Sequence, residues 1–240
     1  MEALKQFILT QQYNPGFTGV WVNPFFHARR ELFRAIKRLG SKIEGRVLDV
    51  GCGSKPYQAL FAACEYVGLE LDTSDNRARK QADVFYRGDV FPFPAQSFDS
   101  VVCSQVLEHV FSPEKFLAEI FRVMKPGGSM LLTVPFVWDE HEQPMDFGRY
   151  SSFGLRYLLE KAGFQVFEQC KINADIRVLF QLANAYLYKV LWTRYSVLNL
   201  IICVALMAPF NILGTLLYRL LPSNPDLFLD NVVLARKPER

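Results

Sequence analysis

The sequence predicts an α/β fold in which helices flank an open, mostly parallel sheet. Two observations support this prediction. Short apolar runs alternate with amphipathic helical patterns over most of the chain, and one run, Val47 to Val50, leads directly into a turn containing Gly51 and Gly53. Glycine permits positive φ and close approach of a ligand, and ligands of open α/β sheets bind at the carboxyl ends of the strands. We therefore expect the functional site at this turn.

The residues after the turn exclude two common ligands. A dinucleotide fingerprint needs a third glycine three positions after Gly53, where this chain has Pro56. A phosphate-binding P-loop needs Gly-Lys-Ser/Thr, and Gly53 is followed by Ser54 and Lys55. What remains is a strand followed by Asp49-x-Gly51-x-Gly53, with a carboxylate placed where a cationic ligand would benefit. A plain glycine turn of another α/β protein is the alternative.

The other elements are predicted from apolar periodicity and from capping residues. Asn23-Pro24, Ser112-Pro113 and Ser151 are typical helix starts. The elements follow in this order: helix 23–40, strand 47–50, a short helix 56–63, strands 66–70, 82–87 and 98–104, helix 112–125, strand 130–134, helix 151–163 and strand 164–168.

Three motifs in this frame carry a family resemblance: Asp49-x-Gly51-x-Gly53, Gly68-Leu69-Glu70 and Lys125-Pro126-Gly127-Gly128. With them, most of 46–170 resembles the class I S-adenosylmethionine (SAM) dependent methyltransferases. The pattern His-Glu-x-Pro-x-Asp-x-x-Arg-Tyr at 141–150 is similar to a bacterial branch of the type 11 group. The resemblance implies a Rossmann-like seven-stranded sheet with an antiparallel last strand, SAM as cofactor, and methyl transfer as the activity.

The resemblance assigns cofactor contacts around the first two strands. Asp49, Gly51 and Gly53 would hold the methionine end of SAM. Glu70 ends the second strand, and one carboxylate there can accept hydrogen bonds from both ribose hydroxyls. Asp72 is the alternative for this role, unless it is only a surface turn residue.

Further contacts are implied at the next two strand ends. Asp89 and Val90 occupy the positions that bind adenine in the family, although a turn carboxylate is the plainer interpretation of Asp89. Ser104 opens the segment that borders the methionine part of SAM and the methyl group.

Candidate catalytic and substrate residues follow strands four and five. His109 or His141 could act as a general base for a hydroxyl acceptor, whereas an amine or carboxylate acceptor needs none. Structuring of the loop is an equal alternative for His109. Asp146, Arg149 and Tyr150 lie in a loop expected over the carboxyl end of the sheet and are candidate substrate contacts. The alternative is an Asp146–Arg149 ion pair that braces the loop.

Composition argues against several other classes of protein. The three histidines are scattered along the sequence, so we expect no metal site. The five cysteines include no Cys-x-x-Cys pair and suit a reducing cytosol. A net charge of +3 without a basic stripe predicts no nucleic-acid partner. The N-terminus shows no signal-peptide pattern.

The predicted domains are an N-terminal helical cap (1–45), a SAM-binding core (46–171), an apolar helical insertion (172–225), and a final strand with the tail (226–240). The insertion contains two helical runs, 176–192 and 195–218. The second run carries no charge between Arg194 and Arg219, which exceeds the roughly 18 residues typical of a transmembrane helix. Asn199, Pro209 and Asn211 interrupt it.

The sheet constrains where this insertion can go. Strands six and seven must pair, so both ends of 172–225 lie on the same side of any membrane and a single crossing is excluded. We expect a hairpin that lies on the inner face of the cytoplasmic membrane. A dimerisation surface or a core-covering helix pair is the alternative, since buried soluble helices are also apolar.

The sequence thus predicts SAM-dependent methyl transfer to a small or lipid-linked acceptor. By analogy with similar sequences, the setting would be glycan or lipid metabolism of the cell envelope, with an isoprenoid quinone as a second apolar candidate. A SAM-binding but inactive membrane-associated scaffold is the alternative from another class. A dehydrogenase is disfavoured by Pro56.

Overall fold

The structure is a computed structural model that describes residues 10–88 and 90–239. The chain divides into two compact units, which are described separately. We call them the sheet unit and the hairpin unit. The sheet unit comprises Ala35–Phe136, Glu140–Cys170 and Asn231–Arg240; the hairpin unit comprises Met1–Arg34, Val137–Asp139 and Lys171–Asp230.

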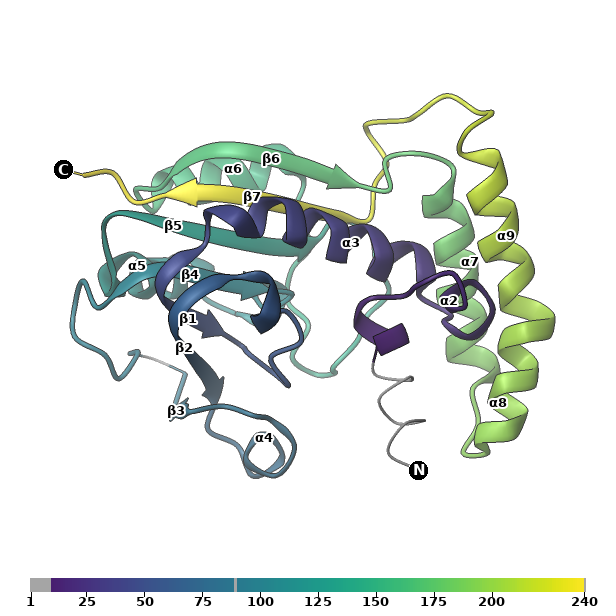
Figure 1. The fold of residues 1–240 in the computed structure, drawn as a ribbon, viewed down its shortest axis with the longest axis horizontal. Helices are drawn as coiled ribbons and strands as arrows, with labels where there is room; N and C mark the ends of the chain where they lie inside the picture. The colour runs from purple at the N-terminus through teal and green to yellow at the C-terminus, as the bar shows by residue number, and fades with distance from the viewer. Residues whose placement is uncertain (1–9, 89, 240) are drawn as a thin grey trace. The chain divides into compact units, whose positions relative to one another are not determined.

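Seven strands of the described residues form one sheet in the order β3-β2-β1-β4-β5-β7-β6. Strands β1 to β5 pair in parallel, and β7 runs antiparallel, as the opposed arrows of β6 and β7 show in Figure 1. The predicted fold class is confirmed. The strands are β1 (Glu44–Val50), β2 (Ala62–Leu71), β3 (Val84–Tyr86), β4 (Phe98–Ser104), β5 (Met124–Pro135), β6 (Gln165–Ile172) and β7 (Asp230–Arg236).

Strand β1 lies in the middle of the parallel part, between β2 and β4. Asp49 is in register with Gly68 on one side and with Val102 on the other. Val47, Leu48 and Val50 are fully buried, as expected for a parallel strand covered on both faces. Helices α5 (Pro113–Val123) and α6 (Ser152–Lys161) contribute apolar side chains to the same core.

The described helical elements before α5 are short, apart from α3 (Phe26–Leu39), which begins two residues after the predicted Asn23-Pro24 start. The Oδ1 atom of Asn23 accepts the Phe25 N–H at 2.7 Å, so the predicted capping residue still serves this end. The others are α2 (Gly19–Val22), η1 (Gly40–Lys42), η2 (Gln58–Leu60), α4 (Ser74–Arg79) and η3 (Leu107–His109).

The helix predicted for 56–63 is wrong. The structure has only the single 3₁₀ turn η2 there, and β2 begins at Ala62 rather than at residue 66. The backbone leaves the glycine turn through Lys55 at φ 53°, and Pro56 then has no N–H to donate. Too few residues remain before Ala62 for a stable α-helix.

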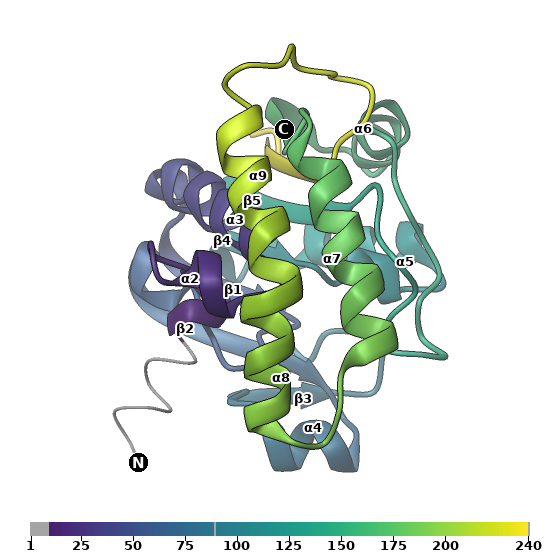
Figure 2. The same cartoon turned by 90° about the vertical axis from the view of Figure 1, so that its right-hand side faces the viewer.

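In the hairpin unit, α7 (Arg177–Leu191) packs beside one continuous helix made of α8 (Ser196–Ile202), the π-helical segment η4 (Cys203–Met207) and α9 (Ala208–Leu217). Figures 1 and 2 show the two helices side by side. Each end agrees with the predicted runs to within one residue. The π-helical segment lies just before Pro209, because proline cannot supply the N–H that would continue regular α-helical bonding.

The continuous helix Ser196–Leu217 is long and apolar enough to cross a membrane by length and composition, with a mean hydropathy of 2.3. Only 28% of its most apolar window is buried. The two ends of the insertion meet: the Leu229 N–H donates to the Ile172 carbonyl at 2.9 Å. The chain therefore returns to the point where it left the sheet.

Several buried amide side chains in the hairpin unit form hydrogen bonds. Asn211 is fully buried, and its Nδ2 donates to the carbonyls of Val20 and Asn23 at 2.9 and 3.0 Å. Its Oδ1 accepts from Asn184 Nδ2 at 3.0 Å. These bonds attach the segment before α3 to the hairpin.

Two further amides hold the hairpin unit together. Gln181 accepts the Ala28 N–H at 3.2 Å and donates to the Pro24 carbonyl at 3.0 Å, which satisfies groups at the start of α3. Asn199 closes the turn between the two helices through the N–H and carbonyl of Thr193, at 2.8 and 2.7 Å.

Replacing Asn211 by Leu leaves two buried carbonyls and the Asn184 amide without this partner. We expect a loss of about 2–4 kcal/mol in the free energy of unfolding, measured by denaturant titration. Leu213→Ala, in the same helix but 44% exposed, is the control and should cost less than about 1 kcal/mol. Equal losses in the two variants would contradict the assigned network.

Candidate functional site

The turn after β1 is tied to the end of β2 by main-chain N–H groups. Gly51 N and Cys52 N both donate to the Leu69 carbonyl, at 2.9 and 3.3 Å. Gly53 N donates to Glu70 Oε2 at 3.1 Å. The turn therefore orients the Glu70 carboxylate as well as its own backbone.

The two glycines of the turn serve different purposes. Gly51 has φ 69°, and a Cβ there would lie 2.3 Å from Cγ2 of Val106. Gly53 has φ 54°, but a Cβ there would meet nothing within 4 Å. Packing thus demands glycine at Gly51, whereas the space beside Gly53 is open to a ligand.

Asp49 lies at the end of β1 and is almost fully buried. The Tyr66 hydroxyl donates to its Oδ2 at 2.7 Å. Burial raises the pKa of Asp49 to about 7, helped by the nearby charge of Glu70 and opposed by the Tyr66 bond and Lys55. A cation bound beside the turn would favour the ionised form.

A cleft of about 980 Å³ opens beside this turn. Of the predicted site residues that the structure describes, Gly51, Glu70, Val90 and His109 line it. Asp89 lies outside the described residues. The lining comes from the turn, the end of β2, the β3–β4 connection, the segment from Gln105 to Ser112, helix α5 and the loop at 142–147.

Glu70 and Asp72 have different surroundings. Glu70 lines the cleft, whereas Asp72 forms two hydrogen bonds with the Arg77 guanidinium, at 2.6 and 3.1 Å. Arg77 holds the pKa of Asp72 below its usual value. The geometry favours Glu70 for a ribose contact.

The end of β4 places Gln105, not Ser104, in the cleft. Ser104 Oγ lies 2.9 Å from Thr133 Oγ1 on the neighbouring strand β5. Gln105 has φ 58° and lines the cleft, where Thr73 and Lys115 also lie. Our sequence reasoning missed these three. Only Thr73 carried a signal: it caps α4 by accepting the Asn76 N–H at 3.1 Å.

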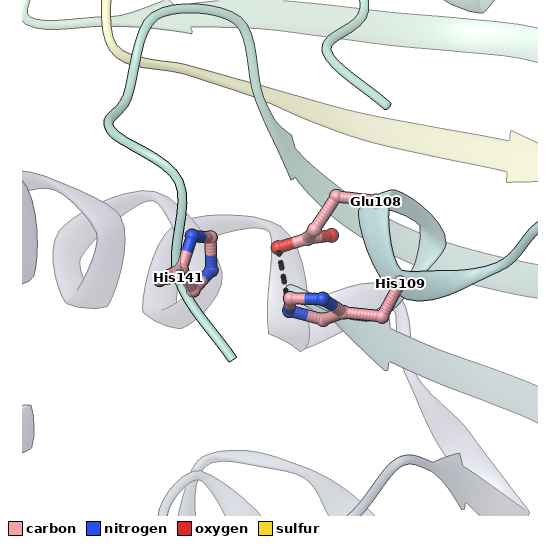
Figure 3. A group of neighbouring side chains, drawn as sticks. All are labelled: Glu108, His109 and His141. Carbon is pink, nitrogen blue, oxygen red and sulfur yellow. Dashed lines mark ion pairs between the residues drawn. The ribbon is translucent and has the colours of Figure 1, made fainter. Parts of the chain in front are cut away.

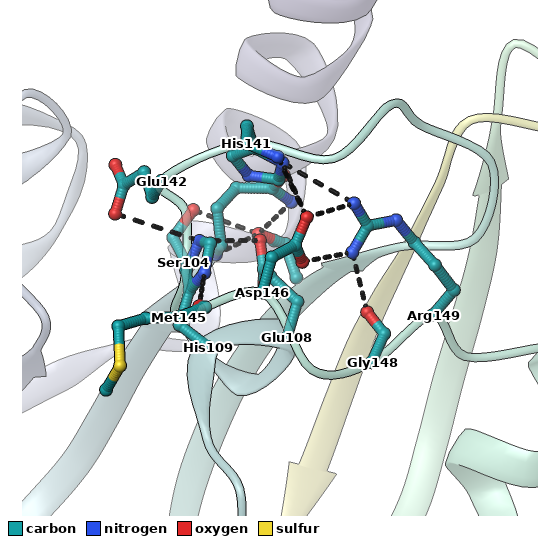
Figure 4. A network of polar contacts seen from close by, with 11 residues as sticks. Ser104, Glu108, His109, His141, Glu142, Met145, Asp146, Gly148 and Arg149 are labelled. Atoms are coloured by element: carbon teal, nitrogen blue, oxygen red, sulfur yellow. Dashed lines mark hydrogen bonds and ion pairs between the residues drawn. The ribbon is translucent and has the colours of Figure 1, made fainter.

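The loop at 140–150 is held down on η3. The carbonyl of Glu108 accepts the N–H groups of Phe147 and Gly148, at 2.8 and 3.1 Å. His109 Nδ1 lies 2.6 Å from the Met145 carbonyl (Figure 4). Since Met145 and His109 both line the cleft, this loop forms part of its wall.

Asp146 and Arg149 are engaged with each other at 2.6 and 2.7 Å. Asp146 also accepts the backbone N–H of His141 at 2.9 Å. Its hydrogen bonds with Arg149 lower the pKa of Asp146 to about 2. Tyr150 is anchored through its backbone to Pro135 and Asn231. The geometry favours the bracing interpretation of this pair over direct substrate contact.

A family model described as a methyltransferase domain matches residues 25–169, more than half of the chain. The chain belongs to this family. The resemblance to class I methyltransferases is thereby confirmed, and SAM is the cofactor that the family indicates. The open space beside Gly53 and the oriented Glu70 carboxylate suit such a ligand.

Three curated relatives show the range of named activities. A probable SAM-dependent methyltransferase of Mycolicibacterium smegmatis is 34% identical over 54% of this chain and 56% of its own length. A sterol 24-C-methyltransferase of Schizosaccharomyces pombe is 39% identical over 42% and 30%. A demethylmenaquinone methyltransferase of Renibacterium salmoninarum is 35% identical over 48% of each. The chain thus spans about half or less of each relative.

Solved structures confirm the fold of this methyltransferase domain. A [4+2]-cyclase has a TM-score of 0.57 at 17% identity and covers 89% of this chain and 83% of its own. A phosphoethanolamine N-methyltransferase of Haemonchus contortus in complex with SAM has a TM-score of 0.55 at 20% identity, covering 92% and 56%. At these identities the likeness shows the fold alone, and the cyclase illustrates that this fold carries different chemistries.

The pKa of Asp49 sets the sign of a pH effect. Its folded-state pKa of about 7 lies above the roughly 3.9 of an unfolded chain, so the folded protein binds more protons between these values. The stability contributed by Asp49 is therefore present at low pH and is lost as the pH rises through 7. Compared with Asp49→Asn, the wild type should lose up to about 3 kcal/mol of unfolding free energy between about pH 5 and pH 8.

Chemical denaturation at several pH values measures this difference. Asp72→Asn is the control, because the lowered pKa of Asp72 places its titration below this window. An Asp49 difference that does not vary with pH would contradict the assignment.

Proposed function

We propose that this protein transfers a methyl group from SAM to a small or lipid-linked acceptor. The observation that carries this proposal is the glycine turn whose Gly53 N–H orients Glu70 at the edge of an open cleft. Family membership supports the reaction type. Because the chain spans only about half of its relatives, activity and acceptor are inferred here from the site.

Glu70 is the proposed ribose contact. Its Oε2 accepts the Gly53 N–H at 3.1 Å and its Oε1 accepts the Leu71 N–H at 3.2 Å. An ionised carboxylate has about four lone-pair sites, so both oxygens retain capacity to accept from a pair of vicinal hydroxyls. The backbone bonds fix the direction in which that capacity is presented.

The other cofactor contacts are proposed on each side of Glu70. Asp49, Gly51 and Gly53 would hold the methionine end, with Ser104 supporting the end of β4. Asp89 and Val90 are the proposed adenine contacts, and Val90 is 65% exposed at the cleft, which supports its part in this proposal.

SAM supplies an electrophilic methyl group, so the chain has little covalent work and acts mainly by alignment and exclusion of water. His109 lines the cleft on the side of the 140–150 loop, and His141 lies beside it. Either His109 or His141 is proposed as the general base if the acceptor is a hydroxyl. Asp146, Arg149 and Tyr150 support this wall of the cleft, so their proposed effect on the acceptor is indirect.

Calorimetric titration with SAM and S-adenosylhomocysteine tests the cofactor site. The wild type should bind with micromolar affinity, about −8 kcal/mol. Glu70→Gln removes charge-assisted hydrogen bonds worth about 1.5–3 kcal/mol and should weaken binding at least about tenfold. Asp72→Asn should bind like the wild type.

Failure of the folded wild type to bind either compound would remove the enzyme proposal. Binding without methyl transfer to lipid or small-molecule extracts would favour the inactive scaffold.

We further propose that the hairpin lies on a membrane surface, on the cytoplasmic side. The helix Ser196–Leu217 reverses the usual pattern of a soluble helix: Asn199 and Asn211 are buried, while leucine, isoleucine and valine are exposed. The exposed apolar residues are Val197, Leu198, Leu200, Ile201, Val204, Leu206, Leu213 and Leu216. A face of this kind is stable only against an apolar partner.

The ends of the helix suit lipid headgroups. Trp192, Arg194 and Tyr195 lie at the turn of the hairpin, and Arg219 packs over Tyr218 beyond the other end of the helix. Aromatic and basic residues are typical of the membrane interface. Because Ile172 and Leu229 are hydrogen-bonded, the hairpin returns to its start and a single crossing is excluded.

An apolar acceptor agrees with a membrane surface. The named acceptors of two relatives, a sterol and demethylmenaquinone, are both lipids. We therefore propose a lipid, a lipid-linked glycan or an isoprenoid quinone of the membrane as the acceptor, over a water-soluble metabolite.

Flotation with vesicles containing anionic lipid tests the surface. The wild type should float with the vesicles, and a triple variant, Leu200→Gln, Ile201→Gln and Val204→Gln, should bind more than about tenfold more weakly, because each side chain contributes about 1.5–3 kcal/mol when buried. Phe153→Gln is the matched control, since Phe153 is equally apolar and 82% exposed on α6.

Absence of flotation together with a stable dimer that the triple variant dissociates would overturn the membrane proposal and assign this face to a second copy.

A further inference from the structure

Glu108, His109 and His141 come together beside the cleft, although 32 positions separate the two histidines in the sequence. Each offers one ligand atom, and these atoms lie within 4.8 Å of one another (Figure 3). We propose that they form a binding site for a divalent transition metal, with zinc as the first candidate. This departs from the sequence-based expectation that scattered histidines exclude a metal.

The ligand set and spacing suit zinc. Two imidazoles and one carboxylate are a common protein ligand set for this ion, at bond lengths of about 2.0–2.2 Å. The edges of a tetrahedron of that size are about 3.4 Å. His109 Nε2 and Glu108 Oε1 are 3.9 Å apart, and all three ligand atoms lie within 4.8 Å of one another, so the side chains would move inward by about 0.5–1.4 Å to hold the ion.

An outer contact orients the ring of His109. Metal-binding histidines typically donate their other N–H to a carbonyl or carboxylate. His109 Nδ1 lies 2.6 Å from the Met145 carbonyl, which directs the Nε2 lone pair toward Glu108. His141 Nδ1 lies 3.4 Å from Asp146 Oδ2 and 3.5 Å from Arg149 Nη2 (Figure 4). Arg149 also holds Asp146 in place, so the Asp146–Arg149 ion pair would help to position His141.

Burial of the ligands favours a specific site over a surface cluster. The Glu108 side chain is fully buried, and those of His109 and His141 are 16% and 28% exposed. The position of Glu108 is set by its own backbone, since its carbonyl accepts from Phe147 and Gly148. The three ligands are therefore held by the same contacts that hold the loop on η3.

The open side of the site faces the cleft. His109 lines the cleft, as does Glu142, whose Oε2 is 3.9 Å from His109 Nε2. Glu142 is exposed and can move toward the ion or away from it. With three protein ligands, a fourth position remains for water or, if the proposed methyl transfer holds, for an oxygen of the acceptor.

Metal binding is measured on tag-free, chelator-stripped protein by calorimetric titration with Zn²⁺, Mn²⁺ and Co²⁺. We expect at least one ion to bind one-to-one, and each of His109→Gln, His141→Gln and Glu108→Gln to weaken its binding at least about tenfold, since even losing a residue that hydrogen-bonds to a metal ligand costs about 10–100-fold. Glu140→Gln is the matched control in the same loop and should bind like the wild type.

The Co²⁺ absorption spectrum identifies the ligands. A nitrogen and oxygen site gives d–d bands without a thiolate charge-transfer band, whereas binding at the exposed Cys64 would give one. Circular dichroism and melting temperature verify that each variant is folded, and they keep this test separate from that of the cofactor site.

No binding to folded wild type would overturn the proposal. So would binding that survives the three substitutions, or binding that a Cys64→Ser substitution removes.

Discussion

The hydrogen bonds from the turn after β1 to the end of β2 are the constraint on which the site depends. Gly51, Cys52 and Gly53 direct three consecutive N–H groups at the Leu69 carbonyl and the Glu70 carboxylate. They can do so only because the backbone takes positive φ at both glycines. One short turn thus closes the carboxyl end of the central strand, aims an acidic side chain at the cleft and leaves room beside Gly53.

In the hairpin unit, buried amide side chains determine how the helices pack. Many of the unit's buried polar groups are paired by amide side chains: Asn211, Asn184 and Gln181 bind backbone groups, and Asn184 also binds Asn211. In an apolar surrounding such bonds specify one arrangement, because any other packing would leave buried donors and acceptors unpaired. Polar contacts in the interior therefore specify how the hairpin packs. Its exposed face does not need polar residues for this purpose and can be apolar.

Local and periodic signals allowed much of the fold to be predicted. The strand and glycine turn at 47–53 were predicted from an apolar run and two glycines, the helical runs of the insertion from their apolar, nearly uncharged sequence, and Glu70 from its place at a strand end. The prediction of a helix at 56–63 was wrong because helix propensity does not reveal that Lys55 has a left-handed backbone conformation. After Lys55, too few residues remain before β2 to form a helix. Gln105 could not be found, since its orientation depends on Thr133 of another strand.

The cluster around Glu108 shows a further limit of sequence reasoning. His109 and His141 become neighbours only when the loop after β5 folds back on η3. The hydrogen bonds from Phe147 and Gly148 that hold this loop cannot be predicted from local sequence patterns. The Asp146–Arg149 pair, in contrast, could be anticipated, because three positions separate two opposite charges in a short loop.

The hydrogen bond between Leu229 and Ile172 has an evolutionary consequence. This hydrogen bond brings the two ends of the insertion together. The hairpin therefore connects β6 to β7 in the same way as a tight turn would. Whole turns could be added to or removed from both helices without changing the register of the sheet. The helices between Ile172 and Leu229 can therefore diverge in length and sequence while the methyltransferase fold stays constant.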